Sequence, residues 1–134
     1  MASISSIRSI GHRNATKLRK SKVRTTESLL DQASTRKGRT EVSQLTGIAT
    51  ADLLRWAHQA DMMRMGGIGS EYADLLAAVG VDTIKVLRRR NAENLMDAMS
   101  QINTRRRLVQ RLPTSEMVQS WIDAAGTSDP MVTS

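Results

Sequence analysis

Apolar residues recur along this chain at every third or fourth position, which is the spacing of one face of an α-helix. Three isoleucines predict a short opening helix, and a longer stripe predicts a helix over residues 51–65. The inward positions are Ile4, Ile7 and Ile10 in the first stripe and Leu53, Trp56, Ala60 and Met63 in the second. No stretch alternates between apolar and polar residues as a half-buried strand would. The pattern therefore predicts an all-α protein, a compact bundle of short helices.

Capping residues, glycines and prolines divide the rest of the chain into further helices. A Ser, Thr, Asp or Asn before an apolar run marks a start, because its side chain accepts a backbone N–H of the first turn. The expected helices span residues 14–21, 26–33, 36–45, 71–79, 83–90, 92–102, 104–112 and 116–125. The expected caps are Thr25 or Thr26, Ser34 or Thr35, Thr50, Asp82, Asn91, and Thr114 or Ser115, and Gly126 is the expected end of the last helix.

The chain contains an internal repeat. The pattern from Ile10 to Leu18 recurs from Ile68 to Leu76, a separation of 58 residues. The same separation joins Val23 to Val81, Thr25 to Thr83 and Leu29 to Leu87, and each copy is followed by a helix carrying a Trp, Trp56 or Trp121. A fixed period indicates two copies of one supersecondary unit. We therefore expect a first repeat over residues 1–65, a second over residues 66–126, and a flexible tail over residues 127–134.

Each copy contains a short turn that is typical of a helix-hairpin-helix. The second turn reads Gly67-Ile68-Gly69, and the first has Ser9 where the pattern would prefer glycine. Glycine accepts the backbone angles of so tight a turn. The start of the helix that follows presents backbone N–H groups and the positive end of the helix dipole, which together favour an anion such as a phosphate.

Positive charge is concentrated in two blocks of the sequence. The net charge of +7 divides into +8 for residues 1–40, −3 for 41–87, +5 for 88–112 and −3 for 113–134. Clustered basic residues indicate a polyanionic partner. Arginine triplets at 88–90 and 105–107 strengthen this indication, because guanidinium groups form bidentate contacts with phosphate.

The two turns differ in the charge that surrounds them, and this difference selects the candidate site. Acidic residues follow the second turn and would repel a phosphate, whereas basic residues follow the first. The predicted nucleic-acid-binding residues are Gly11, His12, Arg13, Lys17, Lys20, Arg88, Arg89, Arg90, Arg105 and Arg106, with backbone N–H groups supplied by Gly11, His12 and Arg13. The second turn, comprising Gly67, Ile68, Gly69, Glu71 and Asp74, is predicted to be structural or to dock on a partner.

The composition argues against several other classes of function. The chain has no Cys, so zinc knuckles and thiol catalysis are excluded. His12 and His58 have no readable nucleophile or metal-ligand partners, and no nucleotide-binding Gly-Lys-Ser/Thr loop is present. We therefore expect no catalytic activity, no metal, no cofactor and no small-molecule substrate. We also expect no membrane insertion and a cytoplasmic location, because no apolar run is long enough for a signal peptide or a membrane span.

Three functions remain open at this point. The first is non-enzymatic binding to nucleic-acid backbone phosphates without sequence preference, with DNA favoured over RNA. The second is a protein-interaction or structural subunit, whose basic blocks bind an acidic protein surface in a larger complex and whose acidic second turn is a further docking surface. The third is an accessory protein on ribosomal RNA. With only three aromatic residues, base stacking on single strands has little support.

The motifs taken together resemble a known family. They include Leu53-Leu54-Arg55-Trp56, Asp61-Met62-Met63-Arg64, Gly67-Ile68-Gly69, Gly80-Val81-Asp82-Thr83 and Arg111-Leu112-Pro113. These stretches are similar to those of the small bacterial proteins grouped as domain of unknown function 4332, described as tandem helix-hairpin-helix-like. The resemblance spans about residues 5–125. It implies a helical repeat fold and a tendency to bind nucleic acid, and it implies no activity.

Overall fold

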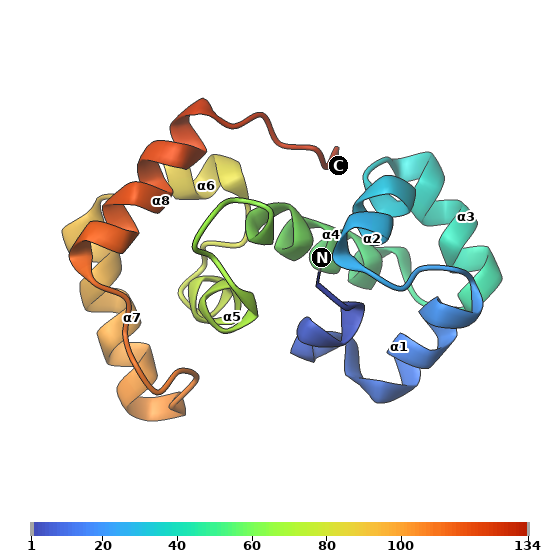
Figure 1. Cartoon of the computed structure of the whole chain (residues 1–134), viewed down its shortest axis with the longest axis horizontal. Helices are drawn as coiled ribbons and strands as arrows, with labels where there is room; N and C mark the ends of the chain where they lie inside the picture. The colour runs from blue at the N-terminus through green and yellow to red at the C-terminus, as the bar shows by residue number, and fades with distance from the viewer. Residues whose placement is uncertain (1, 134) are drawn as a thin grey trace. The chain divides into compact units, whose positions relative to one another are not determined.

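A computed structural model describes residues 2–133 of the chain, and their regular structure is helical (Figure 1). Two short 3₁₀ helices, η1 (Ile4–Ser6) and η2 (Arg8–Ile10), precede α1 (Gly11–Lys20), α2 (Thr26–Ala33), α3 (Arg36–Thr46), α4 (Thr50–Met63), α5 (Ser70–Ala78), α6 (Ile84–Arg88), α7 (Ala92–Arg106) and α8 (Ser115–Thr127). Within the described residues the only extended pairing is one isolated antiparallel bridge, Ser3 with Thr25. The all-α prediction is confirmed.

The chain folds as two compact units. Unit 1 runs to Asp61 and takes in the segment from Met131 onward, and unit 2 comprises Met62–Pro130. In unit 1, α1 packs on η1 and η2, and α2 packs on α3. In unit 2, α8 packs on both α6 and α7, and α5 packs on α7. The division falls four residues before the expected end of the first repeat. Of the segment expected to be a flexible tail, Thr127 ends α8 in unit 2, and residues 131–133 are held in unit 1 by hydrogen bonds.

Four helix starts were readable from local capping residues. Thr25, Thr35, Asn91 and Thr114 each have extended backbone, and each side-chain oxygen accepts an N–H three residues later. These bonds satisfy donors that have no partner within the helix. Gly47 ends α3 in the left-handed conformation, with φ of 76°. Because capping depends on residues close in sequence, the sequence pattern was sufficient for these boundaries.

Several other expected boundaries are wrong. Thr83, and not Asp82, caps α6, because the Thr83 side chain accepts the Val86 N–H at 3.1 Å. The opening segment forms two 3₁₀ turns and not one helix, although Ile4, Ile7 and Ile10 are buried as expected. α8 continues through Gly126 to Thr127.

The expected Arg-rich helix over residues 104–112 does not form. Instead α7 continues through Arg106, and Arg107 ends it with a positive φ of 49°. The Asn103 side chain explains this ending, because it donates to Val109 O and accepts the Val109 N–H. These two bonds fold the residues after α7 back onto its last turn.

Each unit has a core of aliphatic side chains around one Trp. Trp56 and Trp121 are both buried, and the neighbouring Leu53 and Ala60 are buried as predicted. Met62 is buried, whereas Met63, which was expected to point inward, is half-buried. The Trp56 indole N–H has no hydrogen-bond partner among the described residues, so the ring contributes through apolar packing and through the Arg55 guanidinium, which lies 5.9 Å from the ring centroid.

Local backbone geometry recurs between the units at the separation of 58 residues. The N–H of Val23 donates to Leu18 O and that of Val81 to Leu76 O, both at 2.9 Å. Just before these bonds, Lys22 has φ of 68°, and Gly80, 58 residues later, has φ of 85°. Further matched bonds run from Ile10 to Ile7 with Ile68 to Met65, and from Leu29 to Thr25 with Leu87 to Thr83. These hydrogen bonds therefore recur between the two copies, from the end of α1 or α5 to the helix that follows the Thr cap, whereas the turns before α1 and α5 differ in backbone conformation.

α2 and α3 meet at a point where only glycine fits. A Cβ added to Gly38 would lie 2.1 Å from the backbone oxygen of Gln32, well inside van der Waals contact. The first turn of α3 therefore approaches the end of α2 at backbone distance. Gly126 in α8 differs, because a Cβ there would meet no atom within 4 Å.

These two glycines predict opposite responses to the same substitution. Gly38→Ala should destabilise the protein by about 1–3 kcal/mol, because the helices must separate to admit the methyl group. Gly126→Ala should stabilise it by up to about 1 kcal/mol, because alanine loses less backbone entropy in a helix. Urea unfolding midpoints of the two variants measure the difference. Equal midpoints would show that α2 and α3 are not in such close contact.

Candidate functional site

One face of α1 carries only basic side chains. Arg13, Lys17 and Lys20 are spaced four and three residues apart, which places them on a single stripe of the helix, and all three are exposed. Ala15 and Leu18 lie on the opposite side and are buried. Burial of these two apolar residues sets the rotation of α1 about its axis. The stripe of three cations therefore faces solvent, and we call it the basic stripe.

The first turn of α1 carries a basic residue and no acidic one. Five helices, α2, α4, α5, α7 and α8, have an acidic residue in the first turn, where it interacts favourably with the helix dipole. α1, α3 and α6 have none, and in α1 Arg13 lies there instead. Thr35 caps α3 and Thr83 caps α6, whereas α1 has no side-chain cap. The residue before α1, Ile10, provides no side-chain acceptor for the first N–H groups. The start of α1 therefore combines the positive end of a dipole with a cationic side chain.

The turn before α1 does not offer every backbone donor that the sequence predicted. Gly11 has the expected positive φ of 75°, but its N–H already donates to Arg8 O. The prediction that Gly11 supplies an N–H to a phosphate is therefore wrong, and His12 and Arg13 remain the candidates. A cavity of about 310 Å³ lies at this turn, lined by Ser5, Arg8, Gly11, His12 and Ala15.

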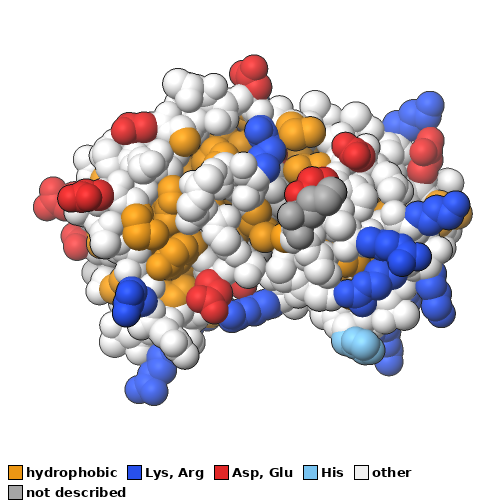
Figure 2. Space-filling model, viewed as in Figure 1, with side chains coloured by type: hydrophobic (Ala, Val, Ile, Leu, Met, Phe, Trp, Pro, Cys, Tyr) orange, Lys and Arg blue, Asp and Glu red, His pale blue; other side chains and the backbone are white. Residues whose placement is uncertain are grey.

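Lys and Arg side chains gather over α1 and the loop that follows it (Figure 2). Lys22 and Arg24, both exposed, extend the basic surface beyond the helix, and Arg19 donates hydrogen bonds to Ser5 Oγ and Ser3 Oγ. Counted over the whole sequence, unit 1 has eleven Lys or Arg against five Asp or Glu, a net charge of +6. Unit 2 has nine against eight, a net charge of +1. Almost all of the excess charge of the protein therefore belongs to unit 1.

The second turn is built for packing within unit 2. Gly67 has φ of 89°, and a Cβ there would lie 3.2 Å from Trp121 Nε1. Ile68 is buried, and Gly69 precedes α5 with extended backbone and a negative φ of −84°. The positive φ therefore falls on the first glycine of this turn, whereas in the first turn it falls on Gly11, the third position.

The helix that follows the second turn has the opposite charge to α1. Exposed Glu71 occupies its first turn, and half-buried Asp74 follows. Tyr72 packs on Trp121 with ring centroids 5.3 Å apart, and its hydroxyl donates to Arg111 O. The aromatic residue of α5 is therefore committed to the packing of unit 2.

The arginines of unit 2 that were predicted to bind nucleic acid lie in different structural environments. Arg88 donates from Nε to Ala125 O at 3.1 Å and from Nη2 to Ser128 O at 2.8 Å, so it caps the C-terminus of α8. Arg89 is exposed just after α6, and Arg90 is half-buried. Arg105 and Arg106 are exposed in the last turn of α7, where cations interact favourably with the dipole. Each of these positions has a structural role or lies at a helix end.

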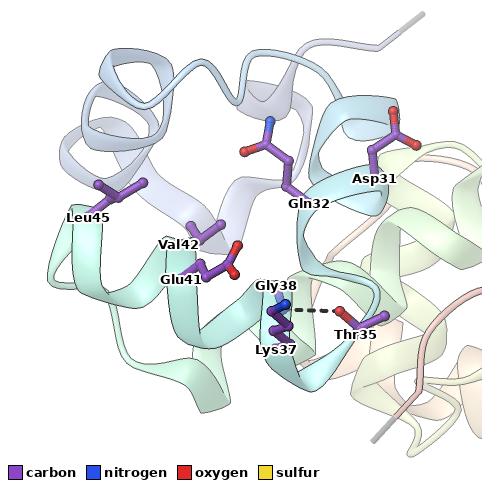
Figure 3. A pocket seen from close by; sticks show the side chains of 8 residues that line it. All are labelled: Asp31, Gln32, Thr35, Lys37, Gly38, Glu41, Val42 and Leu45. Carbon is purple, nitrogen blue, oxygen red and sulfur yellow. Dashed lines mark hydrogen bonds between the residues drawn. The ribbon is translucent and has the colours of Figure 1, made fainter.

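Two further hollows were not foreseen from the sequence. One, of about 420 Å³, lies between α2 and α3 and is lined by side chains of both signs, with exposed Leu45 at the end away from Thr35 (Figure 3). The other, of about 480 Å³, lies between α7 and α8. Its lining includes Glu93, Asp97 and Glu116 and no basic residue. Residues from two helices form each hollow, which is why neither was readable as a sequence motif.

The described residues contain no group of three or more His, Asp or Glu side chains placed to bind a metal ion. Over the same residues, no helix combines the length and the hydropathy needed to cross a membrane.

Comparison with known proteins places this chain in one family. The model of the family described as Domain of unknown function (DUF4332) matches residues 8–128. The chain belongs to this family. No curated protein and no solved structure gives a significant match to the chain. The family match covers both turns and both Trp helices, so the basic stripe and the acidic α5 are parts of one family domain.

Substitutions at Arg88 and Arg89 test whether Arg88 stabilises the protein by capping the C-terminus of α8. Arg88→Ala should destabilise the protein by about 1 kcal/mol, because carbonyls at the end of α8 lose charge-assisted hydrogen bonds. Arg89→Ala, which removes the same charge from an exposed side chain, should change the stability by less than about 0.5 kcal/mol. Urea unfolding of both variants makes the comparison. A loss of the same size in both would assign the effect to charge and not to the cap.

Proposed function

We propose that this protein is a small, non-enzymatic nucleic-acid-binding protein that contacts backbone phosphates through unit 1. The observation that supports the proposal best is the basic stripe of Arg13, Lys17 and Lys20, together with the uncapped start of α1. Arg13 and Lys17 repel each other across one helical turn, at a cost of about 0.2–0.5 kcal/mol. A phosphate bound at this face would offset the repulsion between the two cations by attracting both of them.

Duplex nucleic acid, and DNA before RNA, suits the surface better than a single strand does. Recognition of single strands relies on aromatic side chains that stack on bases. Both Trp residues are buried here, and Tyr72 is packed against Trp121. Contacts to phosphates need only cations and backbone donors, which unit 1 has in excess. We therefore propose binding without sequence preference.

The repeated turns fit a pair of helix-hairpin-helix-like elements in this proposal. The first, with its basic helix, would contact the phosphate backbone. The second, whose turn packs against Trp121 and whose helix begins with Glu71, would maintain the structure of unit 2. Support comes from the recurring hydrogen bonds and from the reversed charge at matched positions, Arg13 in one copy and Glu71 in the other.

Charge reversal on the basic stripe tests the proposal. Arg13→Glu with Lys17→Glu should weaken binding to a random-sequence DNA duplex more than about tenfold at about 0.1 M salt, because phosphate contacts become repulsions. Glu71→Lys with Asp74→Lys should leave binding unchanged or strengthen it. Fluorescence anisotropy of a labelled duplex measures both.

A matched control distinguishes binding through the basic stripe of α1 from attraction by the net charge of the protein. Lys85→Glu with Arg111→Glu makes the same change of four charge units on exposed residues of unit 2. It should weaken binding far less than the change in α1. Equal losses would mean that net charge alone attracts the DNA, and circular dichroism must show the same helix content in every variant.

The hollow between α7 and α8 supports a second candidate function, docking on a basic protein surface. Glu93, Asp97 and Glu116 surround partly buried Ala92 and Met96, so the hollow offers carboxylates beside an apolar floor. A lysine- or arginine-rich segment with an apolar side chain has complementary chemistry.

The docking function makes a separate prediction about this hollow. A basic amphipathic model peptide should bind the protein, and Glu93→Gln with Asp97→Asn and Glu116→Gln should weaken that binding more than about tenfold through loss of charge pairing. The same variant should retain DNA binding. Isothermal titration calorimetry measures the peptide affinity, and equal affinities for both proteins would exclude this hollow as the docking site.

A further inference from the structure

Unit 1 buries two charged side chains, Arg39 and Asp61, with exposed fractions of 3% and 2%. Both make hydrogen bonds to the same short segment, residues 131–133. Arg39 Nη2 donates to Thr133 O at 2.5 Å, and Asp61 Oδ2 accepts the Met131 N–H at 2.9 Å. The second guanidinium nitrogen of Arg39, Nη1, donates to Ala33 O at 2.9 Å.

The segment between these two bonds is also fixed at its centre. Val132 is buried, and the Thr133 N–H donates to Ser34 O at 2.8 Å. We call residues 131–133 the strap, and Ser34, Arg39 and Asp61 the socket. Backbone bonds at both ends and an apolar side chain in the middle are the contacts by which proteins recognise extended peptides. The strap reaches the socket from the far end of the chain, after all of unit 2.

The fold does not require charged residues at the socket positions. Arg39 lies four residues after its cap Thr35 and donates its N–H to Thr35 O, and Leu95 lies four residues after Asn91 with the same bond. Leu95 is fully buried at the position where unit 1 has arginine. Aligned on the Trp helices, with Ala60 opposite Ala125, Asp61 corresponds to Gly126. Unit 2 therefore has Leu and Gly at the positions where unit 1 has Arg39 and Asp61.

Within the described residues the Arg39 guanidinium bonds to backbone carbonyls and to no carboxylate, and burying such a charge is costly unless its donors are satisfied. Desolvation, and to a smaller extent the nearby Arg36, lowers the pKa of Arg39. Carbonyls of Ala33 and Thr133 accept from it, and the second of these belongs to the strap. The strap therefore supplies one of the two carbonyl acceptors that offset the free-energy cost of burying the Arg39 guanidinium.

We propose that the socket is a peptide-binding site for a short extended segment with a β-branched apolar residue at its centre, and that the strap occupies it as a detachable, built-in ligand. Detachment of the strap opens the site to a separate peptide of the same chemistry. The site lies in unit 1, shares no residue with the basic stripe, and does not depend on nucleic-acid binding.

Replacing Arg39 with the residue of the sister unit tests the attachment of the strap. Arg39→Leu in the full chain should keep helix content, because Leu95 fills the matched position, while the Met131 and Thr133 amides lose at least about tenfold in hydrogen-exchange protection. Arg36→Leu, on the exposed neighbour, should keep that protection. A strap that stays protected in Arg39→Leu would overturn the proposed role of the guanidinium.

A second experiment tests whether the socket binds a separate peptide. Val132→Asp in the full chain should release the strap, and a synthetic peptide with the sequence of residues 128–133 should then bind saturably by calorimetry. Adding Arg39→Leu should weaken that binding at least about tenfold. The unaltered chain should not bind the peptide at the same concentration, because its tethered strap competes at an effective concentration in the millimolar range.

If the Val132→Asp protein keeps its helix content but does not bind the peptide, the proposal that the socket is a peptide-binding site is contradicted. If that variant loses helix content, Met131→Pro replaces it, since proline removes the N–H that bonds to Asp61 and fixes φ at that residue, while Val132 is retained. The same binding is expected there, and its absence has the same meaning.

Discussion

The rotation of α1 about its own axis decides what unit 1 presents to its surroundings. Ala15 and Leu18 are buried, so the opposite face must point outward, and that face carries Arg13, Lys17 and Lys20. No acidic residue on α1 offsets these charges. A ten-residue helix is only marginally stable alone, so packing on the 3₁₀ turns determines both its existence and its orientation. The outward position of the basic stripe is thus a direct consequence of the burial of these two apolar residues.

Comparison of the two units shows how one backbone plan supports different surfaces. The hydrogen bonds around Leu18 and Leu76 coincide, whereas the first turns of the helices that contain them, α1 and α5, differ in charge. Unit 1 has Arg13 where unit 2 has Glu71, and buried Arg39 where unit 2 has buried Leu95. Core positions therefore preserve the fold in both copies, and unit 1 alone adds the basic stripe and the charged socket.

Features that depend on neighbours in the sequence were predictable, and those that depend on distant segments were not. The caps of α2, α3, α7 and α8 and the apolar stripes of the helices are local or periodic, and they were predicted from the sequence. The role of Arg88 depends on carbonyls some forty residues away, and the burial of Arg39 and Asp61 depends on the last residues of the chain. In a sequence, a buried arginine is indistinguishable from a solvated one. The start of α7 was predicted correctly, but the separate helix expected over residues 104–112 does not form, because α7 continues to Arg106 and Asn103 then bonds forward to Val109.

The most direct test of phosphate-backbone binding is the salt dependence of affinity for a random-sequence DNA duplex. If the three cations of the basic stripe each contact one phosphate, a plot of log K against log salt concentration should have a slope of about −3, and an unrelated duplex sequence should give the same line. The release of condensed counterions produces this slope. An affinity that is insensitive to salt, or that changes with the duplex sequence, would contradict the account.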